Sequence, residues 1–329
     1  MRARSAILAI LLAAAPGWHG AGPAAAQDWP NRPLTMVVPF AAGGGTDVLG
    51  RIVGRRLSEI LGQQVVIENV GGAGGMVGSA RVVKAPPDGY QFVLGSRADA
   101  INQTLYKNPL YNFATDLVPV VLIADQPTIL VARKDLPADN LQDFIAYARA
   151  NQSTMQMGSA GAGSTGHLDC MLLNSATGIN VTHVPYRGGG PALQDLIAGR
   201  LDYFCTLSAT AKSQIDARLI KPLAILTRER SSMLPDLPSA QEQGLKDFEA
   251  STWFGFFLPP RTPAPIVQKL NVATVAAMET PSVQERLREV GAVVVAPERR
   301  SSEYLRTFVA SEIAKNAAPI KATGIVMGE

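Results

Sequence analysis

The sequence has few of the residues that build metal centres or nucleic-acid surfaces. Its 329 residues include two cysteines and three histidines, and no C-x-x-C pair occurs, so no metal site is expected. Charged residues make up 17% and aromatic residues 6%, with no run of Lys and Arg interleaved with aromatics. We therefore do not expect a nucleic-acid partner. The hydrophobic fraction of 47% indicates a globular chain, and the length suggests about two domains.

Long hydrophobic runs are also scarce. Beyond the N-terminal segment, no stretch reaches the roughly 18 uninterrupted apolar residues typical of a membrane-spanning helix. The first 26 residues combine Arg2 and Arg4, an apolar segment up to Ala15, and three alanines at 24–26. This order is typical of an export signal with its cleavage site. We therefore expect residues 1–26 to be a signal peptide and the rest of the chain to reach the periplasm.

Short apolar segments alternate with amphipathic segments along most of the chain. The apolar segments predict strands at 34–39, 64–68, 90–94, 154–158, 180–184, 201–206, 222–227 and 251–258. The amphipathic segments predict helices at 48–61, 76–84, 140–150, 164–176, 190–198, 208–217, 264–279, 282–290 and 301–316. Such alternation is typical of an α/β fold with helices on both faces of a parallel sheet.

The alternation is interrupted at two places, which predicts a second domain. The apolar runs 118–124 and 128–132 follow each other directly, which predicts a strand pair crossing into that domain, and 251–258 predicts the returning strand. We expect two doubly wound α/β domains, 27–125 plus 249–329 and 126–248, with hinges near 124–128 and 246–252. A ligand cleft is expected between them, facing the carboxyl ends of the strands.

A glycine-rich loop, residues 39–47, follows the first expected strand. Its three consecutive glycines let the backbone approach a ligand closely. Thr46 is expected to cap the following helix, whose free N–H groups suit an anion such as a carboxylate. Alternatively, the glycines only form a tight turn. Asp47 either pairs with the dipole of its own helix or accepts a hydrogen bond from a bridging water or a ligand hydroxyl.

A second glycine-rich loop, residues 158–167, contains G-x-G-x-x-G at positions 161, 163 and 166. This pattern occurs in dinucleotide sites, but no clear candidate exists for the acidic residue that would bind the ribose. A second anion site, with Ser164 and Thr165 as hydroxyl donors, is the simpler interpretation. His167 falls in the first turn of the expected helix, where a helix N-terminus disfavours the imidazolium form. It is either structural or in contact with the ligand.

Other candidate residues are fewer. Arg187, in a third glycine-containing turn, either binds a carboxylate through both guanidinium nitrogens or is a surface arginine. Asn69 and Ser96 follow expected strands directly, which is the only reason to place them at the cleft. No G-x-S-x-G, H-E-x-x-H, P-loop or kinase motif occurs, so no enzymatic activity is expected.

The two cysteines are expected to form a disulfide. Cys170 lies in the expected helix 164–176, and Cys205 lies near the end of the expected strand 201–206. In a doubly wound domain this helix packs on the sheet that contains the strand, and export supplies an oxidising compartment. The alternative is two separate buried thiols.

Several motifs occur together along the chain. They are Trp29-Pro-x-Arg-Pro-Leu34, Pro39-Phe-x-x-Gly-Gly-x-x-Asp47, Glu68-Asn-x-x-Gly-Ala-Gly-Gly75, Pro87-Asp-Gly-Tyr90, Gly163-Ser-x-x-His-Leu168, His183-Val-Pro-Tyr-Arg-Gly188, Asp195-Leu-x-x-Gly-x-x-Asp202 and Trp253-x-Gly-x-x-x-Pro259. Together they resemble the Bug-type extracytoplasmic solute receptors of tripartite tricarboxylate transporters, over essentially the whole chain after residue 26.

The resemblance implies a periplasmic receptor of the type II binding-protein kind, monomeric and without a cofactor. Such a receptor closes on a small organic carboxylate and delivers it to the membrane components of its transporter. The resemblance implies that loops 40–47 and 159–167 hold one carboxylate, partly through ordered waters. The expected ligand-binding residues are Phe40, Ala42, Gly43, Gly44, Thr46, Asp47, Ser96, Ser159, Ala160, Gly163, Ser164, His167 and Arg187. Many relatives have proline where this chain has Ala42.

Two other functions remain open at this stage. One is a secreted enzyme that uses the glycine-rich loops to bind a phosphate or nucleotide, and the other is an interaction protein whose cleft is unused. The identity of the carboxylate is open too, because the resemblance covers receptors for tricarboxylates, dicarboxylates, acidic amino acids, nicotinate and aromatic acids. We predict that the two loops face each other across the cleft. We also predict that backbone donors contribute more to binding than Arg187.

Overall fold

The computed structural model describes residues 29–322, 324 and 326–327. The expected signal peptide, residues 1–26, lies outside the described residues. The strands are β1 (Leu34–Val38), β2 (Val65–Asn69), β3 (Gln91–Ser96), β4 (Val118–Arg133), β5 (Gln156–Ser159), β6 (Thr182–Pro185), β7 (Tyr203–Leu207), β8 (Ile220–Ile225), β9 (Ser251–Leu258) and β10 (Val293–Val294). The helices are α1 (Gly45–Leu61), α2 (Met76–Val83), α3 (Arg97–Leu105), α4 (Leu141–Asn151), α5 (Thr165–Thr177), α6 (Gly189–Ile197), α7 (Ser208–Asp216), α8 (Ala264–Met278), α9 (Pro281–Glu289) and α10 (Ser302–Ala322).

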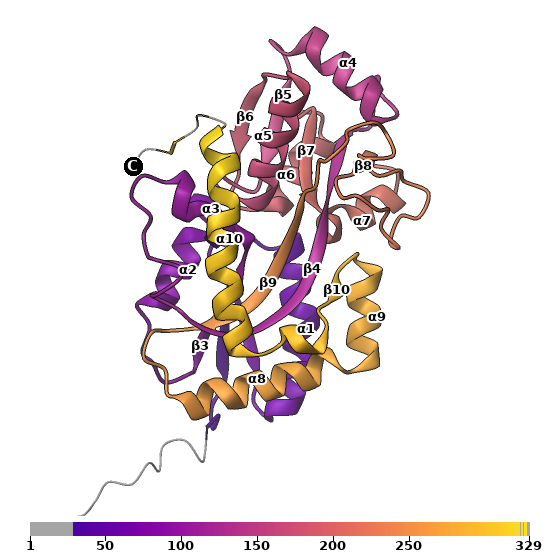
Figure 1. The fold of residues 1–329 in the computed structure, drawn as a ribbon. Helices are drawn as coiled ribbons and strands as arrows, with labels where there is room; N and C mark the ends of the chain where they lie inside the picture. Colours follow the sequence, from indigo (N-terminus) through magenta and orange to yellow (C-terminus); the bar gives the residue numbers. More distant parts are fainter. Residues whose placement is uncertain (1–28, 323, 325, 328–329) are drawn as a thin grey trace, which may run out of the picture.

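Two long strands, β4 and β9, connect the two ends of the molecule (Figure 1). The main path of the sheet runs β2-β1-β3-β9-β4-β7-β5-β6, and β8 and β10 pair with β4. The pairs β1–β2, β1–β3, β5–β6 and β5–β7 are parallel, whereas all pairs made by β4 and β9 are antiparallel. The parallel α/β units predicted from the sequence therefore lie on either side of an antiparallel centre.

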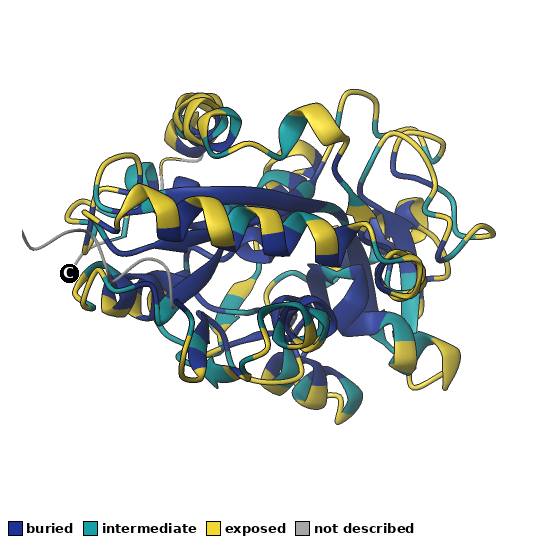
Figure 2. Cartoon of the chain, turned by 90° about the horizontal axis from the view of Figure 1, so that it is seen from below, coloured by how far each residue is buried: buried dark blue, intermediate teal, exposed yellow. Residues whose placement is uncertain are grey.

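Most buried apolar residues form separate cores at the two ends of the sheet, and a small cluster of residues 101, 105, 168 and 320 packs α3 and α10 against α5. One core is built from residues between 29 and 124 and between 253 and 309, and we call the elements around it the first lobe. Two smaller cores are built from residues between 129 and 250, and their elements, α4–α7 with β5–β8, form the second lobe. In Figure 2 the central strands are buried, while the helices expose their outer faces.

Three local predictions differ from the structure. The predicted strand pair at 118–132 is wrong: β4 is one strand, because Asp125, Gln126 and Pro127 pair with β9 and continue the ladder through a segment that looks like a turn. Helix α3 was not predicted, although Ser96 and Asp99 form a capping box at its start. Helix α10 continues beyond residue 316 to Ala322.

A buried ion pair joins the lobes beside the two long strands. Arg97 on α3 of the first lobe donates to Asp169 on α5 of the second lobe at 2.7 Å. Asp169 also accepts from the Thr128 hydroxyl on β4, and Arg97 donates to the carbonyl of Ser251 on β9. The pair therefore binds both strands that cross between the lobes. Among the described residues, no helix has the length and apolar character needed to cross a membrane.

Candidate functional site

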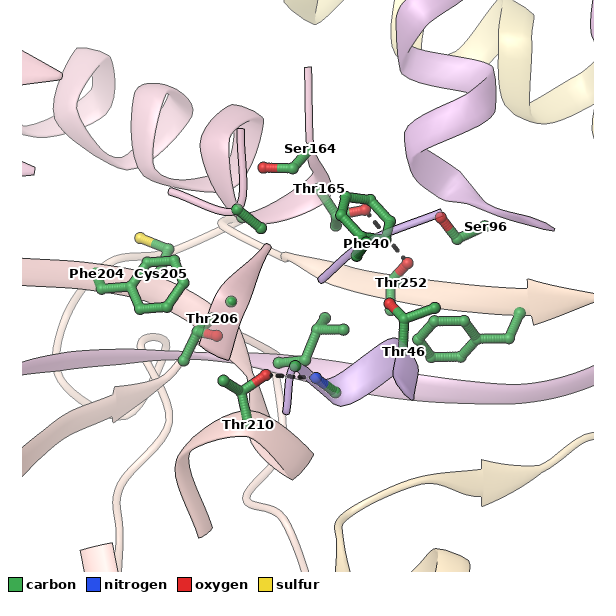
Figure 3. Close-up of a pocket in the computed structure, with 17 residues that line it drawn as sticks. Phe40, Thr46, Ser96, Ser164, Thr165, Phe204, Cys205, Thr206, Thr210 and Thr252 are labelled. Carbon is green, nitrogen blue, oxygen red and sulfur yellow. Dashed lines mark hydrogen bonds between the residues drawn. The ribbon is translucent and has the colours of Figure 1, made fainter. Parts of the chain in front are cut away.

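A small cavity of about 40 Å³ lies where the two lobes meet (Figure 3). Both glycine-rich loops reach it, from opposite lobes, so they face each other as predicted. The lining residues are Phe40, Gly44, Gly45, Thr46, Ser96, Ala160, Ser164, Thr165, Gly166, Gly189, Phe204, Cys205, Thr206, Leu207, Thr210, Thr252 and Phe254. None of these described residues carries a charge.

Five helices begin at this cavity. The lining includes the N-terminal cap of α1 (Gly44), α3 (Ser96), α5 (Ser164) and α7 (Leu207), and the first residue of α6 (Gly189). Each helix N-terminus presents free N–H groups and the equivalent of roughly half a positive charge. The cavity is thus electropositive although no cationic side chain lines it.

The second lobe contributes most of this positive potential. Asp47 lies in the first turn of α1 and Asp99 in the first turn of α3, so an acidic side chain already offsets these two dipoles. The first turns of α5, α6 and α7 contain no acidic residue. An anion in the cavity would therefore be stabilised chiefly by the three helix starts of the second lobe.

Two hydroxyl groups in the cavity have no hydrogen-bond partner among the described residues. Thr46 and Thr206 are 5% and 3% exposed and line the cavity from opposite lobes. The prediction that Thr46 caps α1 is wrong, because the cap is Gly44 and the helix starts at Gly45. The Thr46 hydroxyl does not cap the helix and is therefore available to hydrogen-bond a ligand. Because both hydroxyls belong to residues that line the cavity, these two are candidates for ligand contacts.

Asp47 holds the first loop in shape. Its carboxylate accepts from Gly43 N at 3.0 Å, from Arg51 Nε at 2.9 Å and from Asn69 Nδ2 at 2.9 Å. Burial alone would raise the pKa of Asp47, but hydrogen bonds from Arg51, Gly43 and Asn69 outweigh it and hold the pKa below its usual value. Asn69 also donates to the carbonyl of Phe40. Both side chains thus support the loop and lie outside the cavity lining.

Two histidines support the second loop in the same way. His167 accepts from Gly163 N through Nδ1, and His183 Nε2 shares a hydrogen bond of 2.7 Å with the Ser159 hydroxyl. The two imidazole rings lie 4.2 Å apart between centroids. Burial, with a smaller contribution from His183, lowers the pKa of His167 to about 3, which favours the neutral ring through burial rather than through the helix N-terminus used in the prediction. Burial lowers the pKa of His183 to about 4.

The lobes meet over the cavity largely through main chain, and two side chains add hydrogen bonds: the Tyr106 hydroxyl donates to the carbonyl of Ala162, and Thr210 Oγ1 accepts from Gly45 N. We call this contact the glycine seam: residues 41–44 and 71–74 of the first lobe against 161–163 and 187–190 of the second. Ala41 N donates to Arg187 O at 3.0 Å. A Cβ at Gly188 would lie 2.6 Å from Ala41 N, and one at Gly71 would lie 2.3 Å from Arg187 O. The lobes can approach this closely only because glycine occupies these positions.

The structure brings some of the sequence-predicted residues together and not others. Phe40, Gly44, Thr46, Ser96, Ala160 and Ser164 line the cavity, and Ala42, Gly43, Asp47, Ser159, Gly163, His167 and Arg187 do not. The side chain of Arg187 is exposed, and only its carbonyl joins the seam. Sequence reasoning missed Gly189, Phe204, Thr206, Thr210, Thr252 and Phe254. Thr206 lies near the carboxyl end of β7, the same signal that selected Ser96.

The predicted disulfide is confirmed. Cys170 on α5 and Cys205 on β7 are bonded, with a Cα–Cα distance of 5.4 Å. Both residues are completely buried, and Cys205 lines the cavity. Among the described residues, no group of three or more histidine, cysteine or acidic side chains is arranged to hold a metal ion.

Comparison with known proteins identifies the family of the chain. A family profile described as "Tripartite tricarboxylate transporter family receptor" matches residues 49–325. A UPF0065 protein of Agrobacterium vitis is 41% identical, covering 92% of this chain and 87% of the relative. The protein BugT of Bordetella pertussis is 34% identical, covering 92% and 93%.

Solved structures are similar over nearly the whole chain. The periplasmic binding protein BugD matches with a TM-score of 0.89 and 36% identity, covering 92% of this chain and all of that one. MatC of Rhodopseudomonas palustris with bound malate matches with a TM-score of 0.86 and 36% identity, covering 89% of this chain and all of that one. A second Rhodopseudomonas palustris protein, with adipate, matches with a TM-score of 0.86 and 37% identity, covering 92% of this chain and all of that one.

Proposed function

Since this chain belongs to the tripartite tricarboxylate transporter receptor family, we propose that it captures a small organic carboxylate in the cavity between its lobes. We further propose that it does so in the periplasm, as a monomer, and delivers the ligand to the membrane components of its transporter. The relatives with malate and with adipate support the carboxylate class.

One observation carries the proposal. Five helix N-termini meet at an uncharged cavity, which the threonines at positions 46 and 206 line from opposite lobes. Backbone N–H groups at helix starts are well suited to bind a carboxylate without a cationic side chain. No described lining residue is a carboxylate, imidazole or amine that would act as a general base. These features favour a receptor over an enzyme.

We propose that the ligand closes the lobes about the two long strands. The domains would then be residues 27–125 plus 249–329 and 126–248, and the hinges would lie near 124–128 and 246–252. The separate cores of the two lobes and the continuous pairing of β4 with β9 support this division. Hinge closure around a ligand is a common response of such paired domains.

A thermal-shift panel tests the proposed function. Malate, adipate, succinate, citrate and nicotinate are compared with their neutral amides and with ATP. We expect at least one carboxylate to raise the unfolding midpoint, because a ligand that binds only the folded state stabilises it. The amide of that acid should have no effect, since it lacks the charge that the helix starts recognise. Stabilisation by ATP and by no carboxylate would support the enzyme alternative.

The free hydroxyls should contribute directly to affinity. Replacing Thr206 with valine is expected to weaken binding of the stabilising carboxylate about tenfold, because a hydrogen bond to a charged group is worth about 1.5 kcal/mol. Thr46→Val should have a similar effect from the other lobe. Thr307→Val, an exposed position on α10, is the matched control and should leave the dissociation constant unchanged. Unchanged affinity in both cavity variants would remove these hydroxyls from the site.

The glycine seam should also control affinity. A side-chain methyl at Gly188 would lie 2.6 Å from Ala41 N and keep the lobes apart, so Gly188→Ala is expected to weaken binding at least tenfold, about 1.4 kcal/mol. The φ of Gly188 is 167°, which is extended backbone, so the substitution causes no local strain. Gly199→Asn is the control, because no atom lies near Gly199 and asparagine tolerates its positive φ. Small-angle scattering at saturating ligand should show a larger radius for Gly188→Ala than for the control.

A further inference from the structure

The disulfide joins the two elements of the second lobe that frame the cavity. Helix α5 contributes its N-terminal cap and first turn, residues 164–166, to the lining. Strand β7 contributes Phe204, Cys205, Thr206 and Leu207. Cys170 lies roughly one and a half turns along α5 and does not line the cavity. The crosslink thus ties the body of α5 to the strand that its first turn faces.

The contact between these elements is unusually close at the cavity. A Cβ at Gly166 would lie 2.1 Å from the carbonyl oxygen of Cys205, so the first turn of α5 rests directly on the main chain of β7. Thr206, with its unpartnered hydroxyl, is the next residue along β7. A shift of α5 relative to β7 would therefore move the helix N–H groups away from this hydroxyl. With no side chain at Gly166, nothing at this contact interlocks to prevent such a shift.

A neighbouring residue fixes α5 in the other direction. Asp169, directly before Cys170, accepts from Thr128 on β4 and from Arg97 of the first lobe. These hydrogen bonds attach α5 to β4 and to the first lobe, and the disulfide attaches it to β7. Without the disulfide, the side-chain link between α5 and β7 is the buried hydrogen bond from the Tyr203 hydroxyl to Asn174, near the C-terminal end of α5. The N-terminal part of α5 would then lose its nearer tie to β7.

We propose that the Cys170–Cys205 disulfide is a positioning element of the ligand site. It sets the N-terminus of α5 against β7, so that the free N–H groups of the helix and the Thr206 hydroxyl face the same ligand group. The cysteines act through Thr165, Gly166 and Thr206, which line the cavity. The effect on affinity rests on the proposed function, whereas the effect on α5 itself does not.

The test uses Cys170→Ala, which removes the crosslink and substitutes no residue of the lining, although the lining residue Cys205 becomes a free thiol. Cys170→Val is measured in parallel, because it fills more of the space that the sulfur occupied. Leu173→Ala is the control: it lies on the same helix, is fully buried and loses core packing, but keeps the disulfide. Dissociation constants for the stabilising carboxylate are measured in the presence of a thiol reductant that does not reach the buried wild-type disulfide. The temperature is one at which all variants are fully folded.

We expect both Cys170 variants to bind about tenfold more weakly and Leu173→Ala to bind within twofold of the wild type. Hydrogen exchange of the ligand-free proteins should be faster at residues 165–168 in the Cys170 variants than in Leu173→Ala. Wild-type affinity in Cys170→Val, or equal weakening by Leu173→Ala, would show that packing alone matters and would overturn the proposal. If the wild type binds no carboxylate, the proposed function fails, and unchanged exchange at 165–168 would separately overturn the positioning role.

Discussion

Replacing Arg97 with methionine is expected to lower the free energy of unfolding by about 3 kcal/mol. Asp169 is fully buried, and Arg97 is its only cationic partner among the described residues. Burial raises the pKa of Asp169 and Arg97 opposes this shift, so the variant would hold either an unpaired buried charge or an extra proton. Removing one partner of a buried ion pair typically costs about 3–5 kcal/mol, and proton uptake limits the loss here.

Urea denaturation at pH 7.5 measures this effect. Arg32→Met is the matched control, since Arg32 pairs with Asp88 where both side chains are exposed, and we expect a loss of less than about 1 kcal/mol. The double variant Arg97→Met with Asp169→Leu should recover part of the stability, because no charge is then left buried. A single Arg97→Met variant as stable as the Arg32 control would mean that the ion pair does not stabilise the junction of the lobes.

Acidification should destabilise the protein through His167. Its pKa is about 3 in the folded protein, because the ring is buried and lies beside His183, compared with 6.5 for a free histidine. Below pH 6.5 the unfolded chain takes up a proton that the folded protein does not, so stability is complete above pH 6.5 and falls as the pH approaches 3. At pH 4.5 this residue alone should cost about 2.7 kcal/mol relative to the stability well above pH 6.5. His183, with a pKa of about 4, acts in the same direction.

The contribution of His167 is isolated by comparing pH profiles. Unfolding free energies of the wild type and of His167→Gln are measured between pH 7 and 4.5. Glutamine cannot gain a proton in this range, so the profile of the variant should be flatter by about 2.7 kcal/mol. Carboxyl groups elsewhere titrate equally in both proteins and cancel in the difference. Parallel profiles would show that His167 is protonated in the folded state as readily as in the unfolded chain.

Local sequence patterns predicted much of the fold and the two loops of the site. The three glycines before Thr46 and the helical spacing after it located the first loop. Both are local patterns: glycines indicate a close backbone approach, and the spacing of apolar residues indicates where a helix starts. The centre of the sheet was harder to predict from the sequence. Asp125 and Pro127 are typical of a turn, yet pairing with β9 keeps β4 continuous, and that pairing joins residues far apart in sequence.

The remaining residues of the cavity lining were not predicted for a similar reason. Phe254 and Thr252 belong to a strand that returns from the second lobe, and nothing in their local sequence indicates which face of β9 meets the cavity. Arg187 was predicted to bind the ligand because a positive charge suits a carboxylate. The structure places its side chain at the surface and uses its carbonyl in the glycine seam. Side-chain chemistry alone thus favoured a cation, whereas the positive potential comes from helix starts that only the assembled fold brings together.

Titration calorimetry tests the central claim most directly. The purified chain is titrated with malate, adipate, citrate and nicotinate, and each acid is compared with its neutral amide under the same conditions. We expect saturable binding of one molecule of at least one acid per chain, no binding of its amide, and recovery of the acid unchanged. Equal binding of acid and amide, chemical conversion of the acid, or no binding of any carboxylate would contradict it.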